Sequence, residues 1–226
     1  MKFFVDTADL DEIAEAASWG ALAGVTTNPS LYSRIGGKVS EFPAHIARIC
    51  EIVDGPVSAE TMASTADEMV ADGRKLAKIA DNVVIKIPMT AAGLAATRVL
   101  ADEDIPVNMT LVFSVPQAIL AARAGARYIS PFVGRFDDIG EDGLAQVSDI
   151  VNAVKNYDFS GVGVRDEEVE IIAASIRSVN HVTQAALMGC DIATVPFGVL
   201  KKCLAHPLTD RGIDAFIKDW EKVVNA

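Results

Sequence analysis

The sequence predicts a single-domain α/β protein, a (β/α)8 (TIM) barrel followed by a C-terminal helix. Three observations predict this fold. Short β-branched runs alternate with longer Ala- and Leu-rich segments of helical spacing, and eight strand–helix repeats can be counted. The 226 residues, 50% of them hydrophobic, suffice for one large core. Eight repeats favour a closed barrel over an open doubly wound sheet, so we expect residues 1–226 to form one domain.

The expected elements follow one another in a regular order. Strands are expected at 3–6, 22–26, 57–60, 83–87, 105–109, 127–131, 170–175 and 191–195. Helices are expected at 9–18, 65–80, 91–101, 114–124, 141–157 and 178–188. Short polar side chains suited to cap these helices are Thr7, Asp9, Ser64, Thr65 and Ser114. Segments 160–169 and 197–206 are the least regular.

Composition excludes several classes of partner. A net charge of −11 and a pI near 4.7 oppose binding to nucleic acid or to an anionic membrane, because both need a basic surface. No apolar run approaches the roughly 20 residues of a membrane span, and the N-terminus lacks a signal-peptide pattern, so we expect a cytoplasmic protein. Cys50, Cys190 and Cys203 are odd in number and widely spaced, so we expect three reduced thiols and no zinc site. The spacing of His45, His181 and His206 likewise predicts no helical metal pair.

Lys86 is the first candidate for catalysis. It interrupts the apolar run Val83–Pro88, where a strand should be buried on both faces. Burial favours the neutral amine, which can attack a carbonyl carbon and form a Schiff base. Alternatively, strand alternation turns the side chain into a wet lumen, or its ammonium group reaches solvent. The first hypothesis is therefore covalent carbonyl chemistry.

Polar residues gather where the expected strands end. In a parallel barrel the reactive groups lie at the carboxyl ends of the strands. The residues at these ends are Asp6, Thr26, Thr27, Asn28, Glu60, Asn108, Thr110, Ser130, Ser175 and Arg177. Such residues also cap the helices that follow strands, so any one of them alone would indicate little. Their recurrence on six strands beside Lys86 predicts a site at this end of the barrel.

Five ordered sequence blocks resemble one family. They are Gly24–Ser30, Val84–Pro88, Asn108–Leu111, Ser130–Arg135 and Ala173–Arg177. The chain resembles the small transaldolase and fructose-6-phosphate aldolase family from Phe4 almost to its C-terminus. The resemblance implies a class I mechanism without metal or cofactor, in which Lys86 attacks the C2 carbonyl of a ketose phosphate. A dihydroxyacetone unit is then held as a Schiff base.

The resemblance also assigns proton-transfer roles. Asp6 would remove the C4 hydroxyl proton as the C3–C4 bond breaks; its alternative role is to cap the following helix. Glu60 would move protons through a water held by Thr110 while the Schiff base forms. Alternatively, Glu60 forms an ion pair with Lys86 that keeps the lysine charged and less nucleophilic.

Substrate contacts follow from the same resemblance. Asn28, Asn108 and Ser130 would grip the hydroxyls of the dihydroxyacetone unit, with turn or cap roles as the alternative. Arg135, Arg177 and Ser175 would bind the substrate phosphate, for which the planar guanidinium is suited. The remaining expected substrate contacts are Thr26 and Phe132.

Two positions favour transaldolase over aldolase. Family members that cleave fructose 6-phosphate carry Gln and Tyr where this chain has Glu60 and Phe132. Phe132 has no hydroxyl with which to protonate the carbanionic intermediate, so the bound unit should survive until an aldose phosphate arrives. An aldolase releasing dihydroxyacetone is the alternative, and a non-catalytic sugar-phosphate-binding barrel is a second one.

The C-terminal helix, expected at 209–226, carries an apolar stripe. Phe216, Trp220 and Val224 fall at i, i+4 and i+8 among charged residues. Packing on the chain's own barrel is the default expectation, whereas the resemblance implies docking on a neighbouring subunit of a pentamer or decamer. The chain departs from its relatives in the longer segment 160–169 and in Ile176, where an aromatic residue is common.

Overall fold

The computed structural model describes residues 1–159 and 168–225 and forms a closed parallel barrel in the order β1 to β8. The strands are β1 Lys2–Asp6, β2 Leu22–Thr26, β3 Val57–Glu60, β4 Val83–Pro88, β5 Val107–Val112, β6 Tyr128–Pro131, β7 Glu170–Ala173 and β8 Ile192–Val195. Each strand overlaps its expected range. The predicted (β/α)8 barrel is therefore confirmed.

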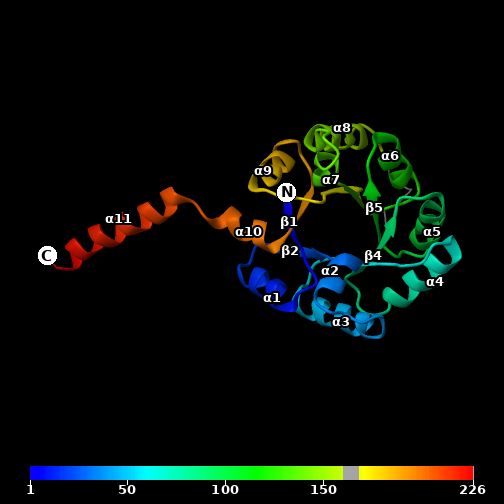
Figure 1. Ribbon diagram of the computed structural model, residues 1–226, viewed down its shortest axis with the longest axis horizontal. Helices are drawn as coiled ribbons and strands as arrows, with labels where there is room; N and C mark the ends of the chain where they lie inside the picture. Colours follow the sequence, from blue (N-terminus) through cyan, green and yellow to red (C-terminus); the bar gives the residue numbers. More distant parts are fainter. Residues whose placement is uncertain (160–167, 226) are drawn as a thin grey trace.

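Helices surround the strands (Figure 1). They are α1 Leu10–Ser18, α2 Pro29–Arg34, α3 Phe42–Ile52, α4 Ala66–Leu76, α5 Ala91–Asp102, α6 Val115–Arg123, α7 Val133–Asp137, α8 Gly143–Lys155, α9 Val179–Leu187, α10 Phe197–Leu204 and α11 Pro207–Val224, with a 3-10 turn η1 Val39–Glu41. Among the suggested caps, Asp9, Thr65 and Ser114 accept backbone hydrogen bonds in the first turns of α1, α4 and α6. Most of the segment 160–169 lies outside the described residues.

The expectation that 197–206 is irregular is wrong, because α10 occupies most of it. Phe197 stacks on Trp19, the residue directly after α1, with ring centroids 5.8 Å apart, and Leu200 is buried one turn later. This short apolar stripe directs the helix onto the barrel. Gly198 and the Lys201–Lys202 pair conceal its periodicity in the sequence.

The barrel interior has an apolar layer below a polar one. Phe4, Val84, Tyr128, Ile172 and Ile192 form a separate apolar cluster, whereas Ile85 and other residues of opposite parity belong to the larger core between strands and helices. Alternation along a strand places residues two apart on the same face. The next inward residue of β4 after Val84 is therefore Lys86, at the carboxyl end of the barrel.

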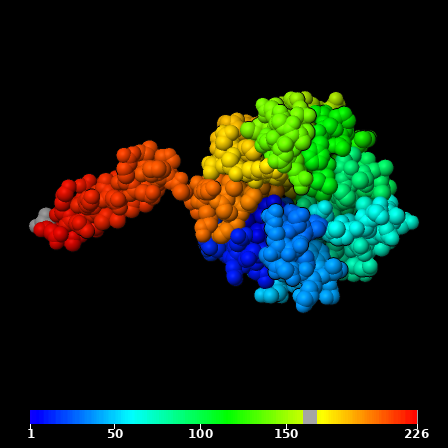
Figure 2. All heavy atoms as spheres, in the orientation of Figure 1, coloured from blue at the N-terminus to red at the C-terminus, as the bar shows by residue number. Residues whose placement is uncertain are grey.

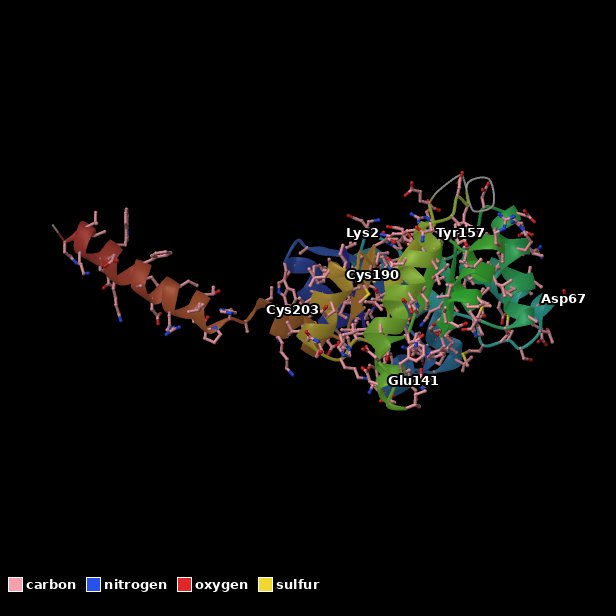
Figure 3. The ribbon with its side chains drawn as sticks, turned by 90° about the horizontal axis from the view of Figure 1, so that it is seen from above. Lys2, Asp67, Glu141, Tyr157, Cys190 and Cys203 are labelled. Carbon is pink, nitrogen blue, oxygen red and sulfur yellow. The ribbon has the colours of Figure 1, made fainter. Side chains whose placement is uncertain are left out.

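α11 projects away from the barrel (Figures 1 and 2), and Figure 3 shows the same from a direction at right angles. None of its residues is buried; Phe216 is 77% and Trp220 67% exposed. The default expectation that the stripe packs on the chain's own barrel is therefore wrong. Within the described residues, no helix is both long and apolar enough to cross a membrane.

Candidate active site

A cavity of about 470 Å³ opens at the carboxyl ends of the strands. In Figure 3, Lys2 and Tyr157 lie near one end of the barrel and Glu141, which follows β6 and α7, lies near the other, cavity-bearing end. The cavity is lined by Asp6, Thr26, Asn28, Pro29, Ser30, Leu31, Arg34, Glu60, Lys86, Thr110, Leu111, Ser130, Phe132, Arg135, Ala174, Ser175 and Arg177. Eleven of the twelve residues predicted from the sequence are in this set, and Asn108 is the exception.

Lys86 is buried, with 7% of its side chain exposed. Its ammonium Nζ donates to the carbonyl oxygen of Thr27 at 3.0 Å and lies 3.1 Å from Oε2 of Glu60. Glu60 is its register partner on the neighbouring strand β3. The side chain therefore does not reach solvent, and its nitrogen faces the cavity with two oxygen partners.

Glu60 and Lys86 form the ion pair that the sequence analysis gave as the alternative to proton transfer by Glu60. The pair also gives the lysine proton a direct acceptor, because no other group intervenes at 3.1 Å. Thr110 lines the same cavity, and its buried hydroxyl has no hydrogen-bond partner among the described residues. A buried hydroxyl without a partner costs free energy, so this position suits a bound water or substrate hydroxyl.

Asp6 faces Lys86 and Glu60 from β1. Burial raises the pKa of its carboxyl, while the charge of Lys86 and a hydrogen bond from Thr26 act in the opposite direction. Thr26 Oγ1 donates to Asp6 Oδ1 at 2.8 Å and accepts from the hydroxyl of Thr194 on β8. Asp6 is not a helix cap, because Asp9 caps α1. Its carboxylate is therefore available to the cavity.

The three amide and hydroxyl candidates differ in placement. Asn28 caps α2 by accepting from the Leu31 N–H at 3.0 Å, which leaves its amide nitrogen for the cavity. Asn108 is fully buried: its Oδ1 accepts from Ser130 at 2.7 Å and its Nδ2 donates to Ser58 at 3.1 Å. Asn108 thus orients Ser130 from beneath, and Ser130 lines the cavity.

Phe132 forms part of an aromatic wall beside the cavity. Its ring centroid lies 5.6 Å from that of Phe113, which also contacts Phe136 edge-on at 5.6 Å. Two cavity residues, Leu111 and Ser175, have left-handed backbones with φ of 57° and 56°. Non-glycine residues rarely adopt this conformation, and such strain concentrates at functional sites.

Three arginines line the cavity, and Arg34 was not predicted from the sequence. Arg34 ends α2, which follows β2, whereas Arg135 follows β6 on the opposite side of the closed ring. Arg177, after β7, pairs with Asp138. Arg34 stands six residues beyond Asn28, so the only signal for it was its proximity in sequence to the end of a strand. Thr194 and Ser58 were missed as well, because their contacts cross between strands.

Comparison with known proteins places these features in one family. Residues 3–226 match the model of the family Transaldolase/Fructose-6-phosphate aldolase. The chain is 54% identical to a probable transaldolase of Desulfosudis oleivorans over 98% of this chain and 99% of that one. It is 53% identical to a probable transaldolase of Hydrogenobaculum sp., over all of this chain and 99% of the other.

A comparison of structures concerns the fold alone. A 2,3-dimethylmalate lyase, a member of the PEP mutase/isocitrate lyase superfamily, superimposes with a TM-score of 0.55 over 96% of this chain and 82% of the other. The two sequences are 14% identical. At this identity the likeness supports the barrel architecture and carries no statement about chemistry.

Proposed function

We propose that this chain, which belongs to the transaldolase/fructose-6-phosphate aldolase family, is a transaldolase that forms a Schiff base through Lys86. It transfers a dihydroxyacetone unit from fructose 6-phosphate or sedoheptulose 7-phosphate to glyceraldehyde 3-phosphate or erythrose 4-phosphate, as in the non-oxidative pentose phosphate pathway. The observation that carries the proposal is the buried Lys86 amine, 3.1 Å from the Glu60 carboxylate, in a cavity that is also lined by Asp6 and by three arginines.

Lys86 acts as the nucleophile. Its proton passes to Glu60, and the neutral amine adds to the C2 carbonyl of the ketose to form a carbinolamine. Loss of water, assisted by Glu60 and a water held by Thr110, leaves the Schiff base. The orphaned Thr110 hydroxyl and the 3.1 Å Glu60 contact support these assignments.

Asp6 acts as the base for bond cleavage. It takes the proton of the C4 hydroxyl, the C3–C4 bond breaks, and its electron pair moves into the protonated Schiff base to give an enamine. The aldose product leaves. The enamine then attacks the carbonyl carbon of the acceptor, whose oxygen takes the proton back from Asp6, and hydrolysis frees Lys86. Burial of Asp6, which raises its pKa, supports a proton-transfer role at neutral pH.

The remaining cavity residues bind the substrate. The amide nitrogen of Asn28, to which the described residues offer no acceptor, and the hydroxyl of Ser130 are available to the dihydroxyacetone hydroxyls, with Asn108 acting through Ser130. Thr26 contributes by orienting Asp6. We propose that the phosphate of either sugar binds to Arg135, Ser175 and Arg177, which line the cavity after β6 and β7.

Product analysis tests the proposal. The protein is incubated with fructose 6-phosphate, with and without erythrose 4-phosphate, and sedoheptulose 7-phosphate, glyceraldehyde 3-phosphate and free dihydroxyacetone are measured. We expect sedoheptulose 7-phosphate only when the acceptor is present. Dihydroxyacetone released without acceptor would instead identify an aldolase.

Chemical trapping of the Schiff base distinguishes an enzyme from a barrel that only binds sugar phosphates. Borohydride should reduce the Schiff base to a stable bond and add the substrate mass to the peptide containing Lys86, while Lys86→Met should give no adduct. Turnover by the Lys86→Met variant would contradict the mechanism.

A double substitution tests what decides between transfer and release. Glu60→Gln with Phe132→Tyr should raise the release of free dihydroxyacetone, and no rise would refute the proposed role of this pair.

We also propose that the protein is a homo-oligomer, a pentamer or decamer, working in the cytoplasm where phosphorylated sugars are made. None of the 18 residues of α11 is buried, although most of the stability of helices in proteins comes from packing of an amphipathic face. Its exposed Phe216, Trp220 and Val224 would be covered by the barrel of a second copy.

A further inference from the structure

Arg177 is held at the rim of the cavity by Asp138, the residue directly after α7. Both terminal nitrogens of its guanidinium donate to this carboxylate, Nη1 to Oδ1, and Nη2 to Oδ2 at 2.6 Å. The hydrogen-bonded guanidinium holds the pKa of Asp138 below its usual range, so the carboxylate is ionised at neutral pH. Both side chains are about half exposed, and pairs of this kind add little to stability. The arrangement therefore invites a functional explanation.

Gly134 of α7 leaves room for the Arg177 side chain to lie against the helix. A Cβ added at Gly134 would stand 2.5 Å from Nε and 2.9 Å from Cδ of Arg177, closer than packed atoms allow. The Gly134 N–H also donates to the carbonyl oxygen of Ser175 at 3.0 Å. The backbone two residues before the arginine is thus tied to the same short helix.

The neighbouring carboxylate, Asp137, supports the backbone of Arg177 through a histidine. The Arg177 N–H donates to Nδ1 of His181 at 3.4 Å, so the ring carries its proton on Nε2. Nε2 lies 3.4 Å from Oδ2 of Asp137. The two acidic residues at the end of α7 therefore hold the side chain and the main chain of Arg177.

We propose that Asp138 is a positioning residue, which grips the Nη end of Arg177 so that the rest of the guanidinium faces the substrate phosphate. The inference rests on the proposed function, because it requires Arg177 to bind phosphate. A guanidinium has five N–H donors, and Asp138 takes two. Three donors, including Nε–H, remain. Arg135, whose charge acts on Asp138, offsets the negative charge that Asp138 brings to the rim.

The energetic argument concerns side-chain freedom. An unrestrained arginine loses rotamer freedom when it binds a ligand, and this loss weakens binding. A guanidinium that Asp138 already fixes loses less rotamer freedom when the phosphate binds. Without Asp138, the Michaelis constant KM for phosphorylated substrates should rise by about threefold to tenfold, and the effect should fall on KM rather than on kcat.

Steady-state kinetics with Asp138→Ala and Asp138→Asn test the proposal, with erythrose 4-phosphate and unphosphorylated erythrose as acceptors. We expect KM to rise only for the phosphorylated acceptor, and less in Asp138→Asn, whose amide oxygen still accepts one hydrogen bond. In the Arg177→Ala background, Asp138→Ala should have no further effect. The matched control is Asp102→Ala, which removes a bidentate partner of Arg98 on α5 and should leave KM unchanged.

Four outcomes would overturn the inference. A lower KM in Asp138→Ala would mean that the carboxylate competes with the phosphate. Equal effects of Asp138→Ala with and without Arg177 would mean that Asp138 acts elsewhere. If Arg177→Ala raises KM while Asp138→Ala does not, only this inference fails. If Arg177→Ala leaves KM unchanged, the proposed phosphate site fails with it.

Discussion

Glu60→Gln should destabilise the protein far more than Glu41→Gln, although both carboxylates stand 3.1 Å from a lysine nitrogen. The two pairs differ in exposure. The side chains of Lys86 and Glu60 are 7% and 15% exposed, whereas those of Lys38 and Glu41 are 73% and 61% exposed. Glutamine keeps the shape of the side chain and removes its charge. The comparison therefore isolates what burial adds to one ion pair.

The magnitude follows from Coulomb's law at this distance. At 3.1 Å two unit charges attract by about 5 kcal/mol at an effective dielectric constant near 20, and by about 1 kcal/mol in bulk water. The Glu60 variant no longer desolvates a carboxylate, and Asp6 still faces Lys86, so both effects reduce the loss. We expect the free energy of unfolding to fall by about 2–3 kcal/mol for Glu60→Gln. For the exposed pair the loss should be below about 0.5 kcal/mol.

Urea unfolding followed by circular dichroism, at pH 7 and one protein concentration, measures both losses. Repeating it at high salt adds a second criterion, because screening weakens exposed pairs much more than buried ones. Equal losses in the two variants would refute the reasoning. A Glu60→Gln variant more stable than the parent would mean that desolvation of the pair outweighs its attraction.

Three further predictions concern acid–base chemistry, thiols and assembly. The charge of Arg34 lowers the pKa of Asp6, so Arg34→Gln should raise it further. Because the base must be ionised, the fall of kcat/KM on acidification should begin at higher pH, while Arg34→Lys, which keeps the charge, should restore the parent profile. Burial raises the pKa of Cys190 to about 12 and that of Cys50 to about 11, so a disulfide reagent at pH 8 should modify these thiols only after unfolding. Trp220→Glu should lower the mass measured by light scattering, whereas Lys218→Glu should not; an unchanged mass in both would place the oligomer contact elsewhere.

Alternation of apolar runs was sufficient to predict the barrel, because the period of a strand or helix is a local property of the chain. The same pattern made Lys86 the first candidate, because its neighbours Val84 and Ile85 lie on opposite faces of a strand that is buried on both. The carboxyl ends of parallel strands converge in any barrel, so polar residues at those ends could be assigned to one site. The same local reading missed α10, because its stripe spans only two turns.

Tertiary structure decided which of those residues meet. The 3.1 Å contact of Glu60 with Lys86 depends on the register between β3 and β4, which no local pattern records. Barrel closure brings Thr194 of β8 to Thr26 of β2, and the course of α2 brings Arg34 to the cavity. The grip of Asp138 on Arg177 joins residues 39 positions apart. Sequence by itself determined the fold and the end of the barrel where the site lies, since both follow from periodicity; the partners within the site depend on register and closure, which arise only when distant segments pack.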